Sequence, residues 1–151
     1  MSTWSTRLEE LGIELPGVAA PLAAYVPATQ SGSWVFTSGQ LPFVEGKLPA
    51  TGKVGAEVSP EEAKSYAATC ILNALAAVHA LVGIDSIKRV VKVVGFVASA
   101  EGFTGQPGVV NGASELLGEI FGDAGRHARS AVGVAELPIG APVEIELIVE
   151  V

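Results

Sequence analysis

The chain has 151 residues, of which 49% are apolar and 17% are charged, and its formal net charge is −7 at pH 7. This length fits one domain, residues 1–151, with a sizeable core, and the acidic balance argues against a nucleic-acid partner, which needs a basic surface. The single cysteine, Cys70, excludes an internal disulfide and is typical of a reducing compartment.

No targeting, membrane or metal signal stands out in the sequence. Residues 1–15 include acidic side chains and lack the apolar core of a signal peptide. The apolar run Val90–Ala98 is too short to span a bilayer and contains Lys92. His79 and His127 are isolated from each other, and no cysteine pair accompanies them. We therefore expect a cytoplasmic protein with no membrane partner and no bound metal.

Residues 1–20 are interpreted as an N-terminal extension of the domain. The pattern predicts a short helix over Thr3–Leu11, capped by Thr3 or Ser5, and a proline-rich linker over Pro16–Pro21. Next come two β-rich runs, Tyr25–Thr29 and Trp34–Ser38, which the intervening Ser-Gly-Ser joins as a hairpin.

The middle of the chain predicts a loop, a helix and a strand. Residues Phe43–Val58 hold several Gly and Pro and indicate a loop. A helix begins after Ser59, which is followed by Pro60 at the first helical position and by Glu62 at the third. Apolar residues then recur at helical spacing until Gly83, which is placed to end the helix. The Val-rich run Ile87–Val97 predicts a strand that is buried over most of its length.

The last third of the chain predicts a second helix and two further strands. The helix covers about Gly108–Phe121 and the strands cover Arg129–Leu137 and Pro142–Val151. In the last strand, apolar residues alternate with Glu144, Glu146 and other residues that face the opposite way.

The coarse order of these elements is ββ-α-β-α-ββ. It predicts an α+β fold in which one mixed β-sheet carries both helices on one face, because strand–helix–strand connections are right-handed. The other face of the sheet is left bare. Covering it with a neighbouring copy of the chain would account for the high apolar content.

Arg129 and Glu144 are two charged residues on strands that are expected to belong to the core. A charge taken out of water must be paired, hydrogen-bonded or used, and the planar fork of an arginine suits a carboxylate. We therefore expect a small anion site with a second carboxylate to handle a proton or a water. Two plainer alternatives stay open: Arg129 pairs with an acidic residue such as Glu144 across a subunit interface, or Glu144 belongs to a solvated row with Glu146 and Glu150.

Several motifs resemble the signature of the RidA/YjgF/YER057c/UK114 family, formerly labelled endoribonuclease L-PSP. The most specific part is the run Arg129–Val134 with Leu137-Pro138 and Val143–Glu146 behind it. Three shorter pieces stand in the family's order, namely Tyr25-Val26, Thr37-Ser38-Gly39-Gln40 and Val110-Asn111. The resemblance covers roughly Pro21–Val151, and the longer N-terminus is similar to a longer-chain RidA-like branch.

The resemblance implies a chorismate-mutase-like (YjgF-like) fold and a homotrimer with clefts between its subunits. It implies hydrolysis of reactive enamines and imines of the 2-aminoacrylate type to 2-keto acids and ammonia, on a small carboxylate-bearing substrate. No metal or organic cofactor is implied. A non-catalytic trimer that binds small carboxylate metabolites is the alternative, and ribonuclease activity is the weakest hypothesis because the chain is acidic.

The family's site residues map onto this chain position by position. Arg129 matches the arginine that holds the substrate carboxylate, and Glu144 matches the acid that holds the attacking water. Matches to cleft-lining positions are Tyr25, Ser38, Gly39 and Asn111. Ala131 stands where many members have cysteine, so only a backbone contribution would survive there.

The roles of two neighbours of Arg129 have alternatives. Ser130 can bond either the ligand or the backbone. His127 is either a contact at the rim of the site or, as we favour, an exposed loop histidine.

Overall fold

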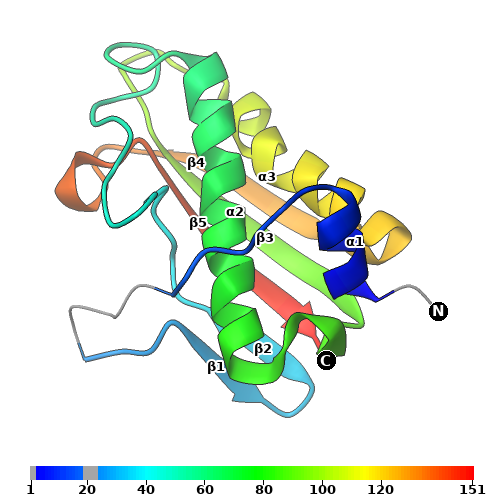
Figure 1. The fold of residues 1–151 in the computed structure, drawn as a ribbon. Coiled ribbons are helices and arrows are strands. Elements are labelled where there is room, and N and C mark those ends of the chain that lie inside the picture. Colours follow the sequence, from blue (N-terminus) through cyan, green and yellow to red (C-terminus); the bar gives the residue numbers. More distant parts are fainter. Residues whose placement is uncertain (1–2, 19–23) are drawn as a thin grey trace.

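A five-stranded mixed sheet organises the chain. The computed structural model describes residues 3–18 and 24–151. The strand order is β1-β2-β5-β3-β4, and the long helices α2 and α3 lie together on one face (Figure 1). This confirms the predicted α+β class and the order ββ-α-β-α-ββ. One further helix, the short α1, precedes them.

The strands are shorter than predicted at several ends. Their bounds are β1 Ala28–Ser31, β2 Trp34–Thr37, β3 Arg89–Ala98, β4 Ala128–Val134 and β5 Val143–Glu150. β1 and β2 form the expected hairpin, in which Ser31 is paired with Trp34. Tyr25 lies before β1, in a bend, and Leu137 lies beyond the end of β4.

β3 lies between β4 and β5, although the chain passes directly from β4 to β5. β3 is parallel to β4 and antiparallel to β5, with Val93 opposite both Arg129 and Leu147. The turn between β4 and β5, which includes the 3-10 turn η3 Pro138–Gly140, therefore crosses the end of β3. As a result, Arg129 and Glu144 lie on strands that are not neighbours.

The helix α2 spans Pro60–Val82 and begins as its sequence predicts. Ser59 caps it by accepting a hydrogen bond from the backbone N–H of Glu62 at 3.1 Å, and Gly83 follows its end. By length and composition this helix could cross a membrane, which corrects the expectation that no segment reaches that size. Here Ile71, Leu75 and other residues of α2 are fully buried in the core, so the apolar content serves packing.

The helix α3 spans Gln106–Phe121 and packs closely against α2. It begins two residues before the predicted start because Pro107 is compatible with a first helical turn. A Cβ atom on Gly112 would overlap the backbone carbonyl oxygen of Lys64 in α2. With Ala63 and Ala67 also buried, small residues let the two helix backbones approach each other.

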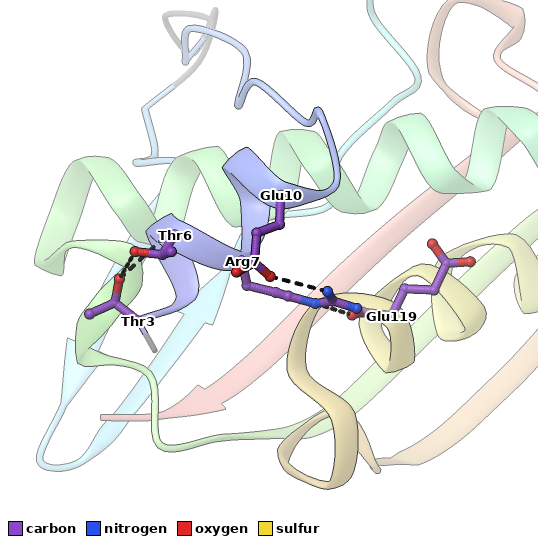
Figure 2. Close-up of polar contacts among 5 residues, drawn as sticks. All are labelled: Thr3, Thr6, Arg7, Glu10 and Glu119. Atoms are coloured by element: carbon purple, nitrogen blue, oxygen red, sulfur yellow. Dashed lines mark hydrogen bonds and ion pairs between the residues drawn. The ribbon is translucent and has the colours of Figure 1, made fainter. Parts of the chain in front are cut away.

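The helix α1, Trp4–Glu10, is attached to the end of α3. Thr3 caps it, accepting from the N–H of Thr6 at 3.2 Å, so Thr3 rather than Ser5 is the cap. Figure 2 shows Arg7 reaching from α1 to α3, where its Nε donates to the carbonyl of Glu119 at 3.1 Å. Trp4 packs edge-on against Phe121, with ring centroids 5.0 Å apart. The linker Pro16–Pro21 lies partly outside the described residues.

The sheet face away from α2 and α3 is only partly polar. In β5 the buried residues alternate with half-buried ones, as predicted, and the half-buried set is Glu144, Glu146, Ile148 and Glu150. On the same face, the side chains of Trp34 and Phe36 in β2 and of Val132 in β4 are 43%, 41% and 43% exposed. We call this surface the open face.

Candidate functional site

Arg129 is a half-buried cation held by an amide and a hydroxyl. Its Nη1 donates to Oδ1 of Asn111 at 2.7 Å and to Oγ of Ser114 at 3.3 Å, both on α3. Within residues 3–18 and 24–151, no carboxylate lies within ion-pair distance of this guanidinium. Arg129 therefore has no ion-pair partner within these residues of its own chain, and pairing across a subunit interface stays a prediction.

The alternation along β4 separates two of the expected site residues. Ala131 lies two positions after Arg129, on the same side, and packs against the core beside the helices. Ser130 is exposed, paired with Val94 of β3, and points to the open face. Ser130 therefore does not share a surface with Arg129 in one chain.

His127 lies in the loop before β4, as we favoured, but it is half-buried rather than exposed and is bonded on both sides of its ring. Its Nε2 lies 2.8 Å from Oγ of Ser114, and its Nδ1 lies 2.6 Å from the carbonyl oxygen of Gly125. Gly125 ends the 3-10 turn η2, Gly122–Gly125, which follows α3 directly. A shallow hollow of about 440 Å³ opens beside this histidine and includes Ser114 and Arg126 in its lining.

Glu144 is a half-buried carboxylate near the start of β5. Burial raises its pKa, and the neighbouring negative charge of Glu146 raises it further. Gly39 lies against this carboxylate, because a Cβ there would be 2.7 Å from Oε2 of Glu144 and would displace the side chain. Glu146 and Glu150 on the same face are half-buried too, so this row of carboxylates is not fully solvated in one chain.

Ser38 connects the segment that carries Tyr25 to the end of β2. Its Oγ donates to the carbonyl of Val26 at 2.6 Å, and its backbone N–H donates to the carbonyl of Pro27 at 2.8 Å. Tyr25 itself is 55% exposed. Tyr25, Ser38 and Gly39 therefore belong to the β2 end of the sheet, together with Glu144.

The expected site residues thus form two groups in one chain. One group is Arg129, Asn111 and Ala131 on the helix side of β4, and the other contains Glu144 on the open face of β5. Two strand spacings of about 4.8 Å and three residues of about 3.4 Å put the backbones of Arg129 and Glu144 roughly 14 Å apart. Their side chains also leave opposite faces, so one small molecule cannot touch both within a single chain.

The sequence analysis does not single out Ser114, which contacts both Arg129 and His127. Its position three residues after Asn111 places it on the same side of a helix. Glu146, predicted on the same strand face as Glu144, raises the pKa of that carboxyl by its negative charge. No cluster of three or more potential metal ligands occurs among the residues that the structure describes.

The sheet order, the two helices on one face and the arginine on the parallel edge strand define a chorismate-mutase-like α+β protein. The chain belongs to the YjgF family: the family model described as "YjgF/chorismate mutase-like, putative endoribonuclease" matches residues 5–151. This confirms the resemblance drawn from the Arg129–Val134 motif.

Individual relatives match over nearly the whole chain. Protein TCP17 of Trypanosoma cruzi is 45% identical over 148 residues, which cover 97% of this chain and 92% of that protein. The crystal structure of protein Atu1372 from Agrobacterium tumefaciens, described as having unknown function, has a TM-score of 0.89 at 49% identity and covers 98% of this chain and 92% of its own. TdcF of E. coli, solved with bound serine, has a TM-score of 0.65 at 28% identity and covers 90% and 92% of the two chains.

Proposed function

We propose that this protein hydrolyses enamine and imine intermediates of the 2-aminoacrylate type to 2-keto acids and ammonia. The reaction would take place in a cleft between neighbouring protomers of a homotrimer. The observation that carries this proposal is Arg129, a half-buried guanidinium without a carboxylate partner in the described residues. Such a cation is ready to receive an anion from outside the chain, and its planar fork fits a carboxylate.

Glu144 supplies the second requirement, a group that positions water and moves a proton. A carboxyl whose pKa is raised towards neutrality is a better general base than an ordinary surface glutamate. Once the imine nitrogen is protonated, Glu144 would take a proton from water as the oxygen bonds to the imine carbon, and the C=N electron pair moves to nitrogen to give a neutral carbinolamine. Glu144 then returns the proton to that nitrogen and the C–N bond breaks. As ammonia leaves, the hydroxyl oxygen forms the carbonyl of the keto acid and gives its proton back to Glu144.

The separation of Arg129 from Glu144 is the reason for placing the site between two copies of the chain. The arginine of one protomer would meet the glutamate of the next, with Tyr25, Ser38 and Gly39 beside that glutamate. The open face supports such an assembly, because Trp34 and Phe36 expose apolar surface on it. A cyclic assembly repeats the same contact at every interface.

A non-catalytic module that binds small carboxylate metabolites is the second candidate. TdcF was solved with serine, an amino acid whose carboxylate is the group that an arginine anchor receives. Ala131 has no nucleophilic group beside Arg129, and a protein that only binds its ligand needs none there. Binding of 2-ketobutyrate without turnover of the imine would favour this candidate over the hydrolase.

The proposal is tested by mixing two inactive variants, Arg129→Ala and Glu144→Ala. Each alone should lose activity in an assay in which a dehydratase supplies the aminoacrylate intermediate and keto-acid formation is followed. After unfolding and refolding together in equal amounts, about a quarter of the interfaces would combine an intact arginine with an intact glutamate, if protomers assort at random. The mixture should therefore recover roughly a quarter of the wild-type activity.

The controls separate the possible failures. Refolding each variant alone should restore no activity, and light scattering should report the mass of a trimer for both. Equal keto-acid formation with and without the wild-type protein would reject hydrolysis. A wild-type enzyme whose variants never complement would reject the shared site. RNA cleavage that persists in Arg129→Ala would instead support the endoribonuclease activity in the family's description.

A further inference from the structure

Arg129 is the end of a chain of hydrogen bonds that runs away from the proposed substrate. The chain passes from Nη1 of Arg129 to Oγ of Ser114 (3.3 Å), then to Nε2 of His127 (2.8 Å), and from Nδ1 of His127 to the carbonyl oxygen of Gly125 (2.6 Å). Ser114, His127 and Gly125 have no role in the reaction described above. These three residues are nevertheless bonded to Arg129, the proposed anchor of the substrate, which raises the question of what they do.

The chemistry of the groups gives every bond in this chain one direction. The carbonyl of Gly125 can only accept, so Nδ1 of His127 carries a hydrogen. In the neutral ring Nε2 is then bare, and it accepts the hydroxyl hydrogen of Ser114. Since a guanidinium can only donate, Oγ of Ser114 accepts from Nη1 of Arg129. The chain is fully satisfied in this single arrangement.

The local backbone makes this arrangement reproducible. Asn111 and Ser114 lie three residues apart on α3. His127, just before β4, and Arg129, the second residue of β4, lie two residues apart and face α3. Gly125 holds η2 against α3, because a Cβ there would overlap the carbonyl oxygen of Leu117. The acceptor for His127 is thereby supplied by rigid backbone.

The bonds restrain one side of the guanidinium and leave the other side open. Nη1 is shared between Asn111 and Ser114, whereas Nε and Nη2 have no hydrogen-bond partner among the described residues. These two nitrogens are not sealed from solvent, because no buried side-chain nitrogen or oxygen lacks a partner in that part of the chain. Nε and Nη2 together form an edge that can give two parallel hydrogen bonds to a carboxylate.

We propose that Ser114 and His127 are positioning residues, which hold Nη1 of Arg129 so that its Nε–Nη2 edge receives the substrate carboxylate. This inference rests on the proposed function for its ligand. Ser114 orients the guanidinium directly, and His127 acts through Ser114 by fixing the direction of its hydroxyl. A pre-oriented fork binds its ligand with less loss of side-chain entropy.

The first test measures binding of 2-ketobutyrate by calorimetry to the full-length protein and its variants. Ser114→Ala should weaken binding by about 12- to 150-fold, the scale of one hydrogen bond to a charged group. His127→Gln should weaken it by about two- to twelve-fold, because the bond from His127 to Ser114 joins neutral groups. Ser114→Thr keeps the hydroxyl and should restore most of the affinity. Arg126→Ala is the matched control, because this exposed cation lies beside His127 but pairs with Asp123 on the surface.

Kinetics distinguish positioning from a general loss of structure. An anchor that binds substrate and transition state equally changes KM and leaves kcat nearly unchanged. Ser114→Ala and His127→Gln should therefore raise KM selectively in the dehydratase-coupled assay. If both variants bind and react like the wild type while Arg129→Ala loses both properties, the positioning role is wrong and the proposed function stands. If Arg129→Ala also binds normally, the proposed function itself fails.

Nitrogen NMR of the ring tautomers provides a test that does not depend on turnover. The sequence has two histidines, and in His79 the Nδ1 accepts from the backbone N–H of Ile84 at 3.0 Å. At about pH 8, where histidine is ordinarily neutral, His127 should carry its hydrogen on Nδ1 and His79 on Nε2. Ser114→Ala should weaken the preference in His127 only. An Nε2–H tautomer of His127 in the wild type would overturn the inference.

Discussion

Glu144 is a single carboxyl whose raised pKa suits the proposed proton transfer and lowers the stability of the fold. Burial raises its pKa, and the charge of Glu146 adds to the effect. A carboxyl whose pKa rises on folding holds its proton more tightly in the native state. Its ionisation therefore lowers the stability of the fold as the pH rises above the unfolded value of about 4.3.

We expect Glu144→Gln to raise the thermal midpoint at neutral pH, because the variant removes a half-buried charge beside Glu146. The difference from the wild type should vanish below about pH 4, where the carboxyl is protonated in both states. Turnover should fall by roughly 100-fold, the scale of a lost general base. Calorimetry across pH and the coupled assay measure the two effects, with Glu101→Gln on an exposed loop as control. A wild type more stable than the variant at pH 7 would contradict this account.

At the scale of elements, α1 is held against the body of the fold by Asp85 in the 3-10 turn η1, Ile84–Ser86. The carboxylate of Asp85 accepts from the backbone N–H of Ser5 at 2.8 Å and from its hydroxyl at 2.7 Å. The backbone bond is the main reason that the pKa of Asp85 is lowered, and the hydroxyl bond adds to it. Trp4 completes the attachment, with Nε1 donating to the carbonyl of Ile87 at 2.7 Å.

Acid should therefore loosen α1 before it unfolds the core. A lowered pKa contributes stability that is present above the unfolded value of about 3.9 and is lost as the pH falls through the folded value. The fluorescence of Trp4, read in a Trp34→Phe background, should change over this range in the wild type. With Asp85→Asn the change should be largely absent, because the charge that titrates is gone. An identical acid transition in both proteins would count against this role of Asp85.

At the scale of the whole molecule, the sheet has one covered face and one open face. α2 and α3 cover the first, with Ile71, Leu75 and Leu117 fully buried there. Trp34 and Phe36 remain exposed on the second, among the carboxylates of β5. Apolar surface on a bare sheet face is typical of an interface, and here a further copy of the chain is the proposed occupant.

Phe36→Asp should separate the proposed trimer into folded monomers. The new charge would have to be buried without a partner at every interface, whereas in one chain it stays exposed to water. Light scattering should give the monomer mass, and circular dichroism should be unchanged. Activity should fall with the assembly because each proposed site combines residues of two chains. Val44→Asp, at a 55% exposed loop position, is the matched control, and a trimer that tolerates Phe36→Asp would place the interface elsewhere.

Much of the fold could be predicted from the sequence because its signals are local. The bounds of α2 follow from Ser59 and Gly83, which act on backbone groups within one helical turn. The alternation in β5 assigns Glu144 to the face opposite its buried neighbours. Arg129 and Glu144 could be chosen as candidates because a charge on a core strand is costly, and because the Arg129–Val134 run resembles the family signature.

Other features were decided only by contacts between distant parts of the chain. The position of β3 between β4 and β5 depends on long-range pairing, and it moves Arg129 away from Glu144. The bonds from His127 to Ser114 join residues of two different elements, which no periodicity relates. The sequence by itself determined which side chains are unusual and on which face of an element each lies. Only the tertiary structure decided which of them meet, because pairing and packing between elements set those distances.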